Sequence, residues 1–113
     1  MTLNVRQLGA ISILSPSGRI GPIEMGQLKH ILKKLLSLGK RQVVVNLEYV
    51  PEMSWSAIGA LAEKSNEFRS QKGEFKVVGL NESLSGTFRA VGAHRAIDLY
   101  DSESEALKSF KPA

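Results

Sequence analysis

The sequence contains no cysteine, which excludes disulfides and every site built on a thiolate. A zinc site would therefore depend on carboxylates and on the two histidines, His30 and His94. The histidines are isolated, because neither an H-E-x-x-H pattern nor another close spacing of His, Asp and Glu occurs. We predict that the chain binds no metal and no cofactor, and that both histidines are ordinary surface or core residues.

Aromatic residues and dense runs of one charge are also scarce. The chain has one Trp, two Tyr and four Phe, and its 15 basic and 11 acidic residues give a net charge of +4 that is spread along the sequence. Nucleic-acid binding normally needs a basic stripe with interleaved aromatic side chains, or a motif that reads a groove. We therefore predict that the chain does not bind nucleic acid.

Long hydrophobic runs are missing as well. Residues 1–7 are polar and extended in character, whereas a signal peptide begins with a basic stretch and continues into an apolar core. No segment is long and apolar enough to span a bilayer. We expect a cytoplasmic protein that is not inserted in a membrane.

The length and overall composition suit one globular domain. The 113 residues leave little room for a second folding unit, so we expect residues 1–113 to form a single domain. Hydrophobic residues make up 42% of the chain and charged residues 23%, which are globular values rather than those of a disordered segment.

The first half of the chain shows alternating strand and helix patterns. Two short runs rich in Val, Ile and Leu flank Gly9 within residues 3–14, which predicts an antiparallel pair of strands. The apolar run 43–47 is typical of a strand covered on both faces of a parallel sheet. Between these strands, apolar residues recur at steps of three and four and predict a helix that ends at Gly39. The buried face of this helix is predicted to contain Leu28, Ile31, Leu32, Leu35 and Leu38.

The second half continues this alternation. Ser54 stands where a helix-capping hydroxyl is expected, ahead of the helical face formed by Ile58, Leu61, Ala62, Ser65 and Phe68. Strands are predicted at 75–80 and 97–100, and a short helix at 83–91 with its inward residues at Leu84, Phe88 and Val91. Ser102 and Glu105 have the spacing of a capping box, which opens a last helix through Phe110.

The order of these elements predicts the fold class. Two strands are followed by a helix, and strands and helices then alternate to the end of the chain. Such an order builds an α/β fold with a mixed, mainly parallel sheet of about five strands and four helices, joined by right-handed crossovers.

Motifs of common catalytic sites are absent. The glycines do not form the G-x-x-x-x-G-K-[ST] phosphate loop, and the serines near Trp55 lack the flanking glycines of a nucleophile elbow. Glu48 and Glu52 flank a turn and are best interpreted as solvated loop residues. We therefore predict that the chain is not an enzyme.

The segment 43–61 combines a buried strand, a polar turn and the start of a helix, and such strand ends often bind ligands or partners. At 100° per residue, Ser56 points away from the apolar face of the helix, where it is either a solvated first-turn residue or a phosphate acceptor. Trp55 lies on the flank of that face, beside Gly59. It is either tucked against the core or exposed as an interface residue.

These residues also resemble a known family, the STAS domains, which include anti-sigma factor antagonists, stressosome scaffolds and the cytoplasmic tails of sulfate transporters. Residues 43–50 (VVVNLEYV) are similar to the third strand and the turn that follows it in the family. Residues 54–61 (SWSAIGAL) fall on the signature D-S-[ST]-G-[LI]-x-x-L, and residues 91–107 resemble the last strand and helix. The resemblance covers nearly the whole chain.

Several positions depart from the family pattern. The phosphorylatable serine of the family falls on Trp55, the aspartate before it on Ser54, and the glycine on Ala57. A second family aspartate, in the pattern G-x-[IL]-D, falls on Gly21. The family's phosphorylation motif is therefore degenerate here, with Ser56 as the candidate phosphate acceptor and Ser54 as the alternative.

The resemblance implies a protein-protein interaction module of the anti-sigma factor antagonist type, active in partner switching or as a scaffold. Its partner would be an anti-sigma factor or a kinase-like regulator. Two alternatives remain open, a STAS subunit that grips the ATPase of an ABC-type membrane transporter and a STAS domain that binds a small anionic ligand. The expected partner-binding residues are Pro51, Glu52, Ser54, Trp55, Ser56, Gly59 and Ala60.

Overall fold

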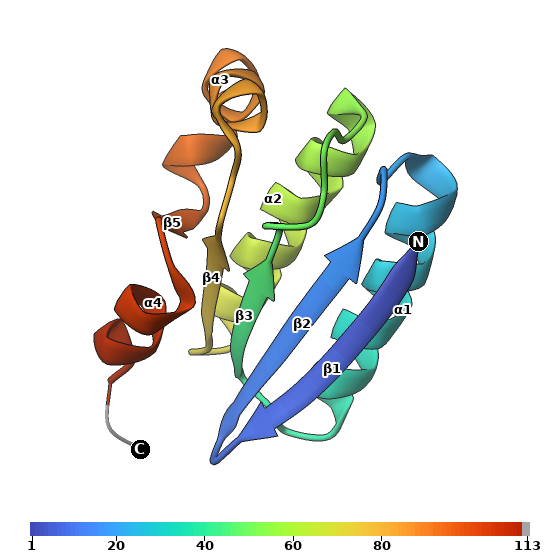
Figure 1. Ribbon diagram of the computed structural model, residues 1–113. Helices are drawn as coiled ribbons and strands as arrows, with labels where there is room; N and C mark the ends of the chain where they lie inside the picture. The colour runs from blue at the N-terminus through green and yellow to red at the C-terminus, as the bar shows by residue number, and fades with distance from the viewer. Residues whose placement is uncertain (112–113) are drawn as a thin grey trace.

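The computed structural model describes residues 1–111, in which strands and helices follow each other in the predicted order (Figure 1). A one-turn 3₁₀ helix at Ala93–Arg95 is the one addition among these residues. The elements are β1 (Thr2–Leu8), β2 (Ile11–Ser17), α1 (Pro22–Ser37), β3 (Gln42–Asn46), α2 (Trp55–Ser70), β4 (Glu74–Val78), α3 (Glu82–Ala90), β5 (Asp98–Tyr100) and α4 (Glu103–Ser109).

The five strands form one sheet in the order β1-β2-β3-β4-β5. The first two strands pair antiparallel, and every other neighbouring pair is parallel. A two-residue turn joins β1 to β2, with Gly9 at a φ of 58° at the first turn position, which in a type II′ hairpin turn favours glycine. The prediction of a mixed, mainly parallel sheet with four helices is confirmed.

Helices cover both faces of the sheet, and apolar side chains fill the space on each side. Helices α1 and α2 lie on one face, α4 lies on the other, and α3 lies beyond the carboxyl ends of the parallel strands (Figure 1). In β3, Val43 and Val45 belong to the cluster under α1 and α2, whereas Val44 packs with Ala106 of α4. The apolar run in β3 is therefore continuous because both faces of this strand are buried.

The sequence-based prediction was wrong at two residues expected to point inward. Leu38 is 61% exposed and Val91 is 37% exposed. Both are C-cap residues, since α1 ends at Ser37 and α3 ends at Ala90. The helical period no longer fixes the direction of a side chain beyond the last helical residue, so the side chains of Leu38 and Val91 leave the apolar face.

The last helix begins as predicted and ends slightly earlier. The Ser102 hydroxyl accepts a hydrogen bond from the Glu105 backbone amide at 3.2 Å, so the serine part of the expected capping box is present. Helix α4 ends at Ser109, and Phe110 is its C-cap.

Within residues 1–111, no helix is both long enough and apolar enough to cross a membrane.

Candidate partner-binding surface

The turn after β3 is held by the buried side chain of Asn46. Its Oδ1 accepts a hydrogen bond from the Glu48 amide at 2.9 Å, and its Nδ2 donates to the Glu103 carboxylate of α4 at 2.7 Å. Gly79 passes close to this turn, and a Cβ atom added there would lie 3.0 Å from the Glu48 nitrogen. The sequence therefore needs a small residue at position 79 to let the two chain segments approach.

The rest of the loop is bonded to the chain that follows β2. Gly18 donates its amide to the Tyr49 carbonyl at 3.0 Å, and Ile20 donates to the Glu52 carbonyl at 3.1 Å. Ser54 then donates its own amide to the Ile20 carbonyl at 3.0 Å. These bonds continue the parallel pairing of the sheet past its regular end, so the loop enters α2 from a fixed direction.

Helix α3 and the core hold the same loop from the other side. The Asn81 side chain donates a hydrogen bond to the Pro51 carbonyl at 3.1 Å. Val50 and Met53 are buried in the main apolar cluster. With backbone bonds on one flank, a side-chain bond on the other and two apolar anchors below, the loop is a preorganised support for the exposed residues that it carries.

Ser54 caps α2, as predicted. Its hydroxyl accepts a hydrogen bond from the Ala57 amide at 3.1 Å, and it lies 3.1 Å from the hydroxyl of Ser56. Ser54 is half-buried, whereas Ser56 is exposed. The two serines therefore differ in role, because one is occupied in capping and the other is accessible at the positive end of the helix dipole.

Trp55 is the first residue of α2, and it is 70% exposed. The sequence left open whether Trp55 is tucked against the core or exposed, and the structure shows that it is exposed. Pro51, Glu52 and Gly59 are also exposed, and Ala60 is half-buried. We call the set Pro51, Glu52, Ser54, Trp55, Ser56, Gly59 and Ala60 the Trp55 surface. The structure brings these seven residues together on one loop and the first turns of one helix.

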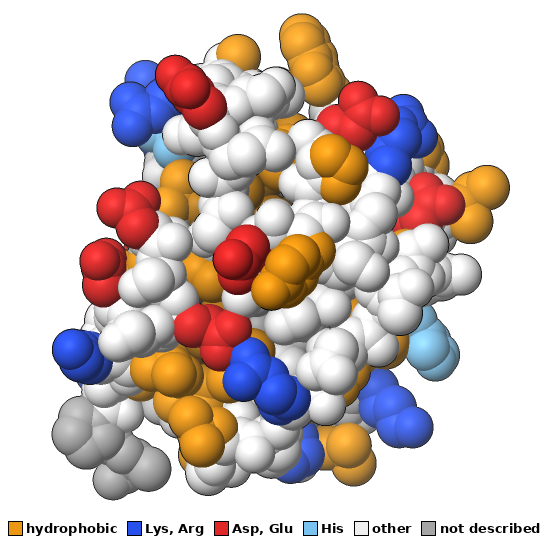
Figure 2. Space-filling view, in the orientation of Figure 1, with side chains coloured by type: hydrophobic (Ala, Val, Ile, Leu, Met, Phe, Trp, Pro, Cys, Tyr) orange, Lys and Arg blue, Asp and Glu red, His pale blue; other side chains and the backbone are white. Residues whose placement is uncertain are grey.

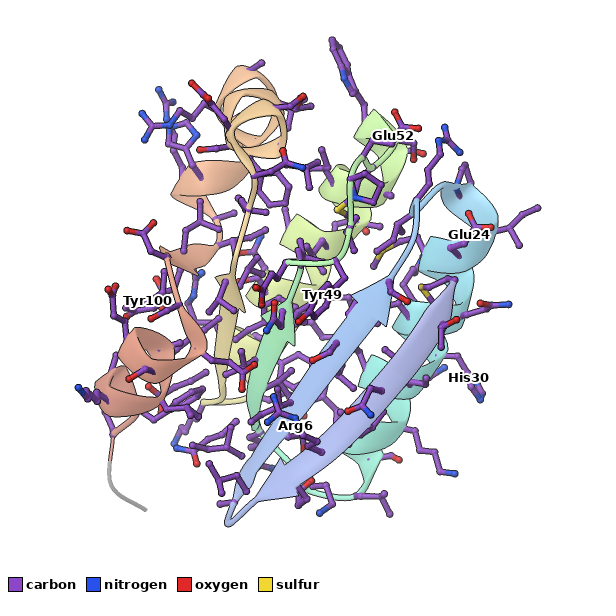
Figure 3. All side chains as sticks on the ribbon, viewed as in Figure 1. Arg6, Glu24, His30, Tyr49, Glu52 and Tyr100 are labelled. Atoms are coloured by element: carbon purple, nitrogen blue, oxygen red, sulfur yellow. The ribbon has the colours of Figure 1, made fainter. Side chains whose placement is uncertain are left out.

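Glu52 has a charged neighbour that the sequence did not indicate. Its carboxylate lies 3.0 Å from the Arg19 guanidinium. Both side chains are largely exposed, so this ion pair contributes at most about 1 kcal/mol to stability. Figure 3 shows Glu52 at the same end of the molecule as Glu24, where α1 and α2 both begin.

Glu24 supplies a carboxylate at the start of α1. The Gly21 amide donates to this carboxylate at 2.8 Å, and that bond lowers the pKa of the Glu24 carboxyl below its ordinary value of 4.5. A side chain at position 21 would approach both Glu24 and Arg19, with an added Cβ about 3 Å from each. Glu24 therefore places an acidic group beside Gly21, although position 21 itself carries no carboxylate.

The start of α1 also borders the Trp55 surface, which sequence reasoning missed. Ile23 is 78% exposed. A hollow of about 200 Å³ separates the first turns of the two helices, and its lining is formed by Pro22, Met25, Gly26, Lys29, Ser56, Ala57 and Ala60. One signal was available in the sequence, because Ile23 is apolar yet falls outside the helical face that Leu28 and Leu32 define.

The face of the sheet opposite α1 and α2 contains a more polar hollow. A hollow of about 380 Å³ there is lined mainly by polar side chains of β1, β2 and the turn after β3. The Arg6 guanidinium in this hollow is paired with the Glu103 carboxylate. Figure 2 shows charged side chains of both signs dispersed over this face. Among residues 1–111, no group of three or more acidic and histidine side chains is arranged to hold a metal ion.

Comparison with known proteins identifies the fold and the family. The model of the STAS domain family matches residues 2–106. The chain belongs to the STAS domain family. No curated protein matches the chain.

Several solved structures share the fold of this STAS domain. An anti-sigma factor antagonist from Mycobacterium paratuberculosis has 19% identity and a TM-score of 0.85, with 96% of this chain and 92% of that chain covered. The anti-sigma factor antagonist SpoIIAA in its unphosphorylated form has 14% identity and a TM-score of 0.76, with 95% and 96% covered. A sulfate transporter family protein from Wolinella succinogenes has 17% identity and a TM-score of 0.78, with 89% and 84% covered.

Proposed function

We propose that this STAS domain is a protein-interaction module that docks a partner through the Trp55 surface. The observation that carries the proposal is the 70% exposure of Trp55 at the start of α2. Exposing a large aromatic side chain to water is unfavourable, and tryptophan is among the residues most enriched at interface hot spots. The adjacent glycine and alanine leave room for a partner to approach the indole ring closely.

The support beneath Trp55 strengthens the proposal. Hydrogen bonds from both flanks fix the loop that leads into α2, and Ser54 fixes the first helical turn. A surface that is already ordered loses little conformational entropy when a partner binds. The Trp55 surface therefore meets two conditions for a docking site, since it is both apolar at its centre and rigidly supported.

We propose that the partner is an anti-sigma factor or a kinase-like regulator. The domain would bind it during partner switching or as part of a scaffold. Support comes from the structural neighbours described as anti-sigma factor antagonists. Phosphorylation, if it regulates this module, falls on Ser56, because Trp55 occupies the family's acceptor position and Ser54 is engaged as a cap. The proposal includes a cytoplasmic location and a single domain over residues 1–113.

A second candidate is a STAS subunit that grips the ATPase of a membrane transporter through the same surface. Association with a membrane transporter, although not with an ATPase in particular, is supported by the structural similarity to the sulfate transporter family protein of Wolinella succinogenes and to the murine anion transporter Slc26a9, the latter with 10% identity and a TM-score of 0.71. The chain spans 18% of that murine protein. The two candidates use one surface and differ in the identity of the partner.

A small anionic ligand has less support. The hollow between the helix starts offers Lys29 but is lined mainly by apolar and small residues. The larger hollow contains Arg6 already paired with Glu103, together with the carboxylate of Glu48. We also propose that the chain binds without turnover, because its sequence lacks the motifs of common catalytic sites. Hydrolysis of nucleotides or esters that is lost on changing Ser56 or Glu52 would contradict it.

Affinity purification from the native host tests the choice between partners. Wild-type protein and Trp55→Ala are used as baits under the same conditions. We expect the wild type to retain an anti-sigma factor or a kinase-like protein that Trp55→Ala loses. Retention of a transporter ATPase, lost in the same variant, would favour the second candidate. Equal retention by both baits would contradict docking through Trp55.

A further inference from the structure

The two edges of the sheet differ in how well they are protected. The edge strand β5 has three residues and begins with an aspartate, whereas the edge strand β1 has seven. Strand β1 contains no proline and has one charged residue, Arg6, and its pairing with β2 runs without a bulge from Thr2 to Leu8. Natural proteins usually protect an exposed edge strand from pairing with another chain by making it short, charged or distorted. Strand β1 is long and regular and carries a single charge, so it has little of this protection.

The register of the hairpin determines which backbone groups of β1 face outward. Leu8 and Ile11 flank the two-residue turn, so they form a hydrogen-bonded pair. Bonded and non-bonded pairs alternate along an antiparallel ladder. The amides and carbonyls of Leu3, Val5 and Gln7 therefore point away from β2, toward the free edge.

Pro16 provides an independent check of this assignment. It lies opposite Leu3 in the register. Proline has no amide hydrogen, so it is tolerated in β2 at a position that donates no bond to β1. The assignment places Leu3 and Pro16 in a non-bonded pair, as the chemistry of proline requires.

We propose that β1 pairs antiparallel with β1 of a second copy of this chain, about a two-fold axis at Val5. The outward groups of Val5 then meet those of Val5 in the second copy, and those of Leu3 meet those of Gln7. This arrangement is self-complementary, because the three outward residues are spaced evenly about Val5. An isologous contact of this kind closes as a dimer and does not grow into a filament.

Side chains near the edge are compatible with this pairing. Val5 is 50% exposed, so helix α1 leaves this part of its own face of the sheet uncovered. Contact with Val5 of the second copy would bury both side chains. Arg6 would lie opposite Asn4, and its guanidinium is paired with Glu103 of its own chain, so no like charges face each other directly across the seam.

The dimer would join the two sheets into one continuous sheet. Because β1 of the two copies run in opposite directions, the carboxyl ends of β2, β3 and β4 would point to opposite ends of the assembly. The Trp55 surface of each copy lies at that carboxyl end and not at the β1 edge (Figure 1). The module would be bivalent, and its dimerisation would be independent of partner docking.

Sedimentation velocity on the purified full chain tests the dimer, from ~1 μM to ~1 mM protein. We expect the mass to rise from the 12.3 kDa of one chain toward twice that value. Val5→Pro removes an outward amide without removing a bond to β2, and Val5→Lys places like charges face to face. Both should stay monomeric over the whole range, whereas the control Val5→Thr, which retains the amide and the strand preference, should still dimerise.

Amide hydrogen exchange gives a readout for individual residues. In dilute protein, the amides of Leu3, Val5 and Gln7 should exchange rapidly and those of Asn4 and Arg6 slowly. In concentrated protein, all five should be protected. A wild type that stays monomeric at the highest concentration would overturn the proposal, as would dimers that persist in both Val5→Pro and Val5→Lys. Loss of the dimer in Trp55→Ala would also overturn it, by assigning self-association to the Trp55 surface.

Discussion

The hydroxyl oxygens of Ser54 and Ser56 lie 3.1 Å apart, and the oxygen of Ser54 also accepts a hydrogen bond from the Ala57 amide. Replacing Ser54 with alanine removes the cap of α2. We expect Ser54→Ala to lower the free energy of unfolding by about 1 kcal/mol, measured by urea denaturation. Ser56→Ala is the matched control and should unfold within about 0.5 kcal/mol of the wild type. Equal losses in the two variants would contradict the assignment of the cap.

A negative charge at position 56 should act on binding and not on folding. The start of a helix favours an anionic side chain by about 0.3 to 1 kcal/mol, so Ser56→Asp should fold normally. The charge would lie within the Trp55 surface and oppose an apolar partner. We expect weaker binding for Ser56→Asp and unchanged binding for Ser56→Ala. Mass spectrometry of protein from its host completes the test, and phosphate found on Ser54 would show that Ser56 is not the acceptor.

Asn46 should be needed for the position of the docking loop. It joins the Glu48 amide to the Glu103 carboxylate, and its removal takes away both of these part-buried hydrogen bonds, although Glu103 keeps its pairing with Arg6. Asn46→Ala should therefore lower the free energy of unfolding by about 1–3 kcal/mol. The exposed Asn66 of α2 is a suitable control, because its replacement by alanine removes no such link. Similar stability for the two variants would show that the Asn46 link does not hold the turn.

Two exposed helical glycines allow stability and binding to be separated. A Cβ atom added at Gly59 in α2 or at Gly86 in α3 meets nothing within 4 Å. Each Gly→Ala change should raise the free energy of unfolding by roughly 0.5–1 kcal/mol. Gly59→Ala should also weaken partner binding, because it adds a methyl group to the Trp55 surface, whereas Gly86→Ala should not. Calorimetric titration with the purified partner distinguishes the two, and equal affinities would place Gly59 outside the interface.

The fold could be predicted because the buried faces repeat with clear periods. Steps of three and four residues locate α1 and α2, and the unbroken apolar run identifies β3 as a strand covered on both sides. Errors occurred at Leu38 and Val91, where the helices end and the period ceases to fix the direction of a side chain. The exposure of Trp55 could not be decided, because a first-turn residue at the flank of a helix turns inward or outward according to the loop that precedes it.

The contribution of α1 to the site could not be predicted for a different reason. Pro22 and Lys29 lie close to Ser56 because α1 and α2 are neighbours on one face of the sheet. That proximity follows from the order of the strands and the direction of the crossovers. An apolar residue outside the buried face, such as Ile23, marks α1 as a candidate, but local sequence patterns do not show that α1 lies beside α2. The site was therefore predicted as one segment when it borders two.

The affinity of the isolated partner for wild type and for Trp55→Ala is the most direct test of the proposed docking site. Binding is measured by calorimetric titration, and folding of both proteins is checked by thermal unfolding. Leu38→Ala serves as the control, since Leu38 is an exposed apolar residue at the other end of α1. We predict that Trp55→Ala weakens binding by more than about 1 kcal/mol, with nearly unchanged thermal stability, and that Leu38→Ala binds as the wild type does. A large loss of thermal stability in Trp55→Ala with unchanged affinity would contradict docking through this residue.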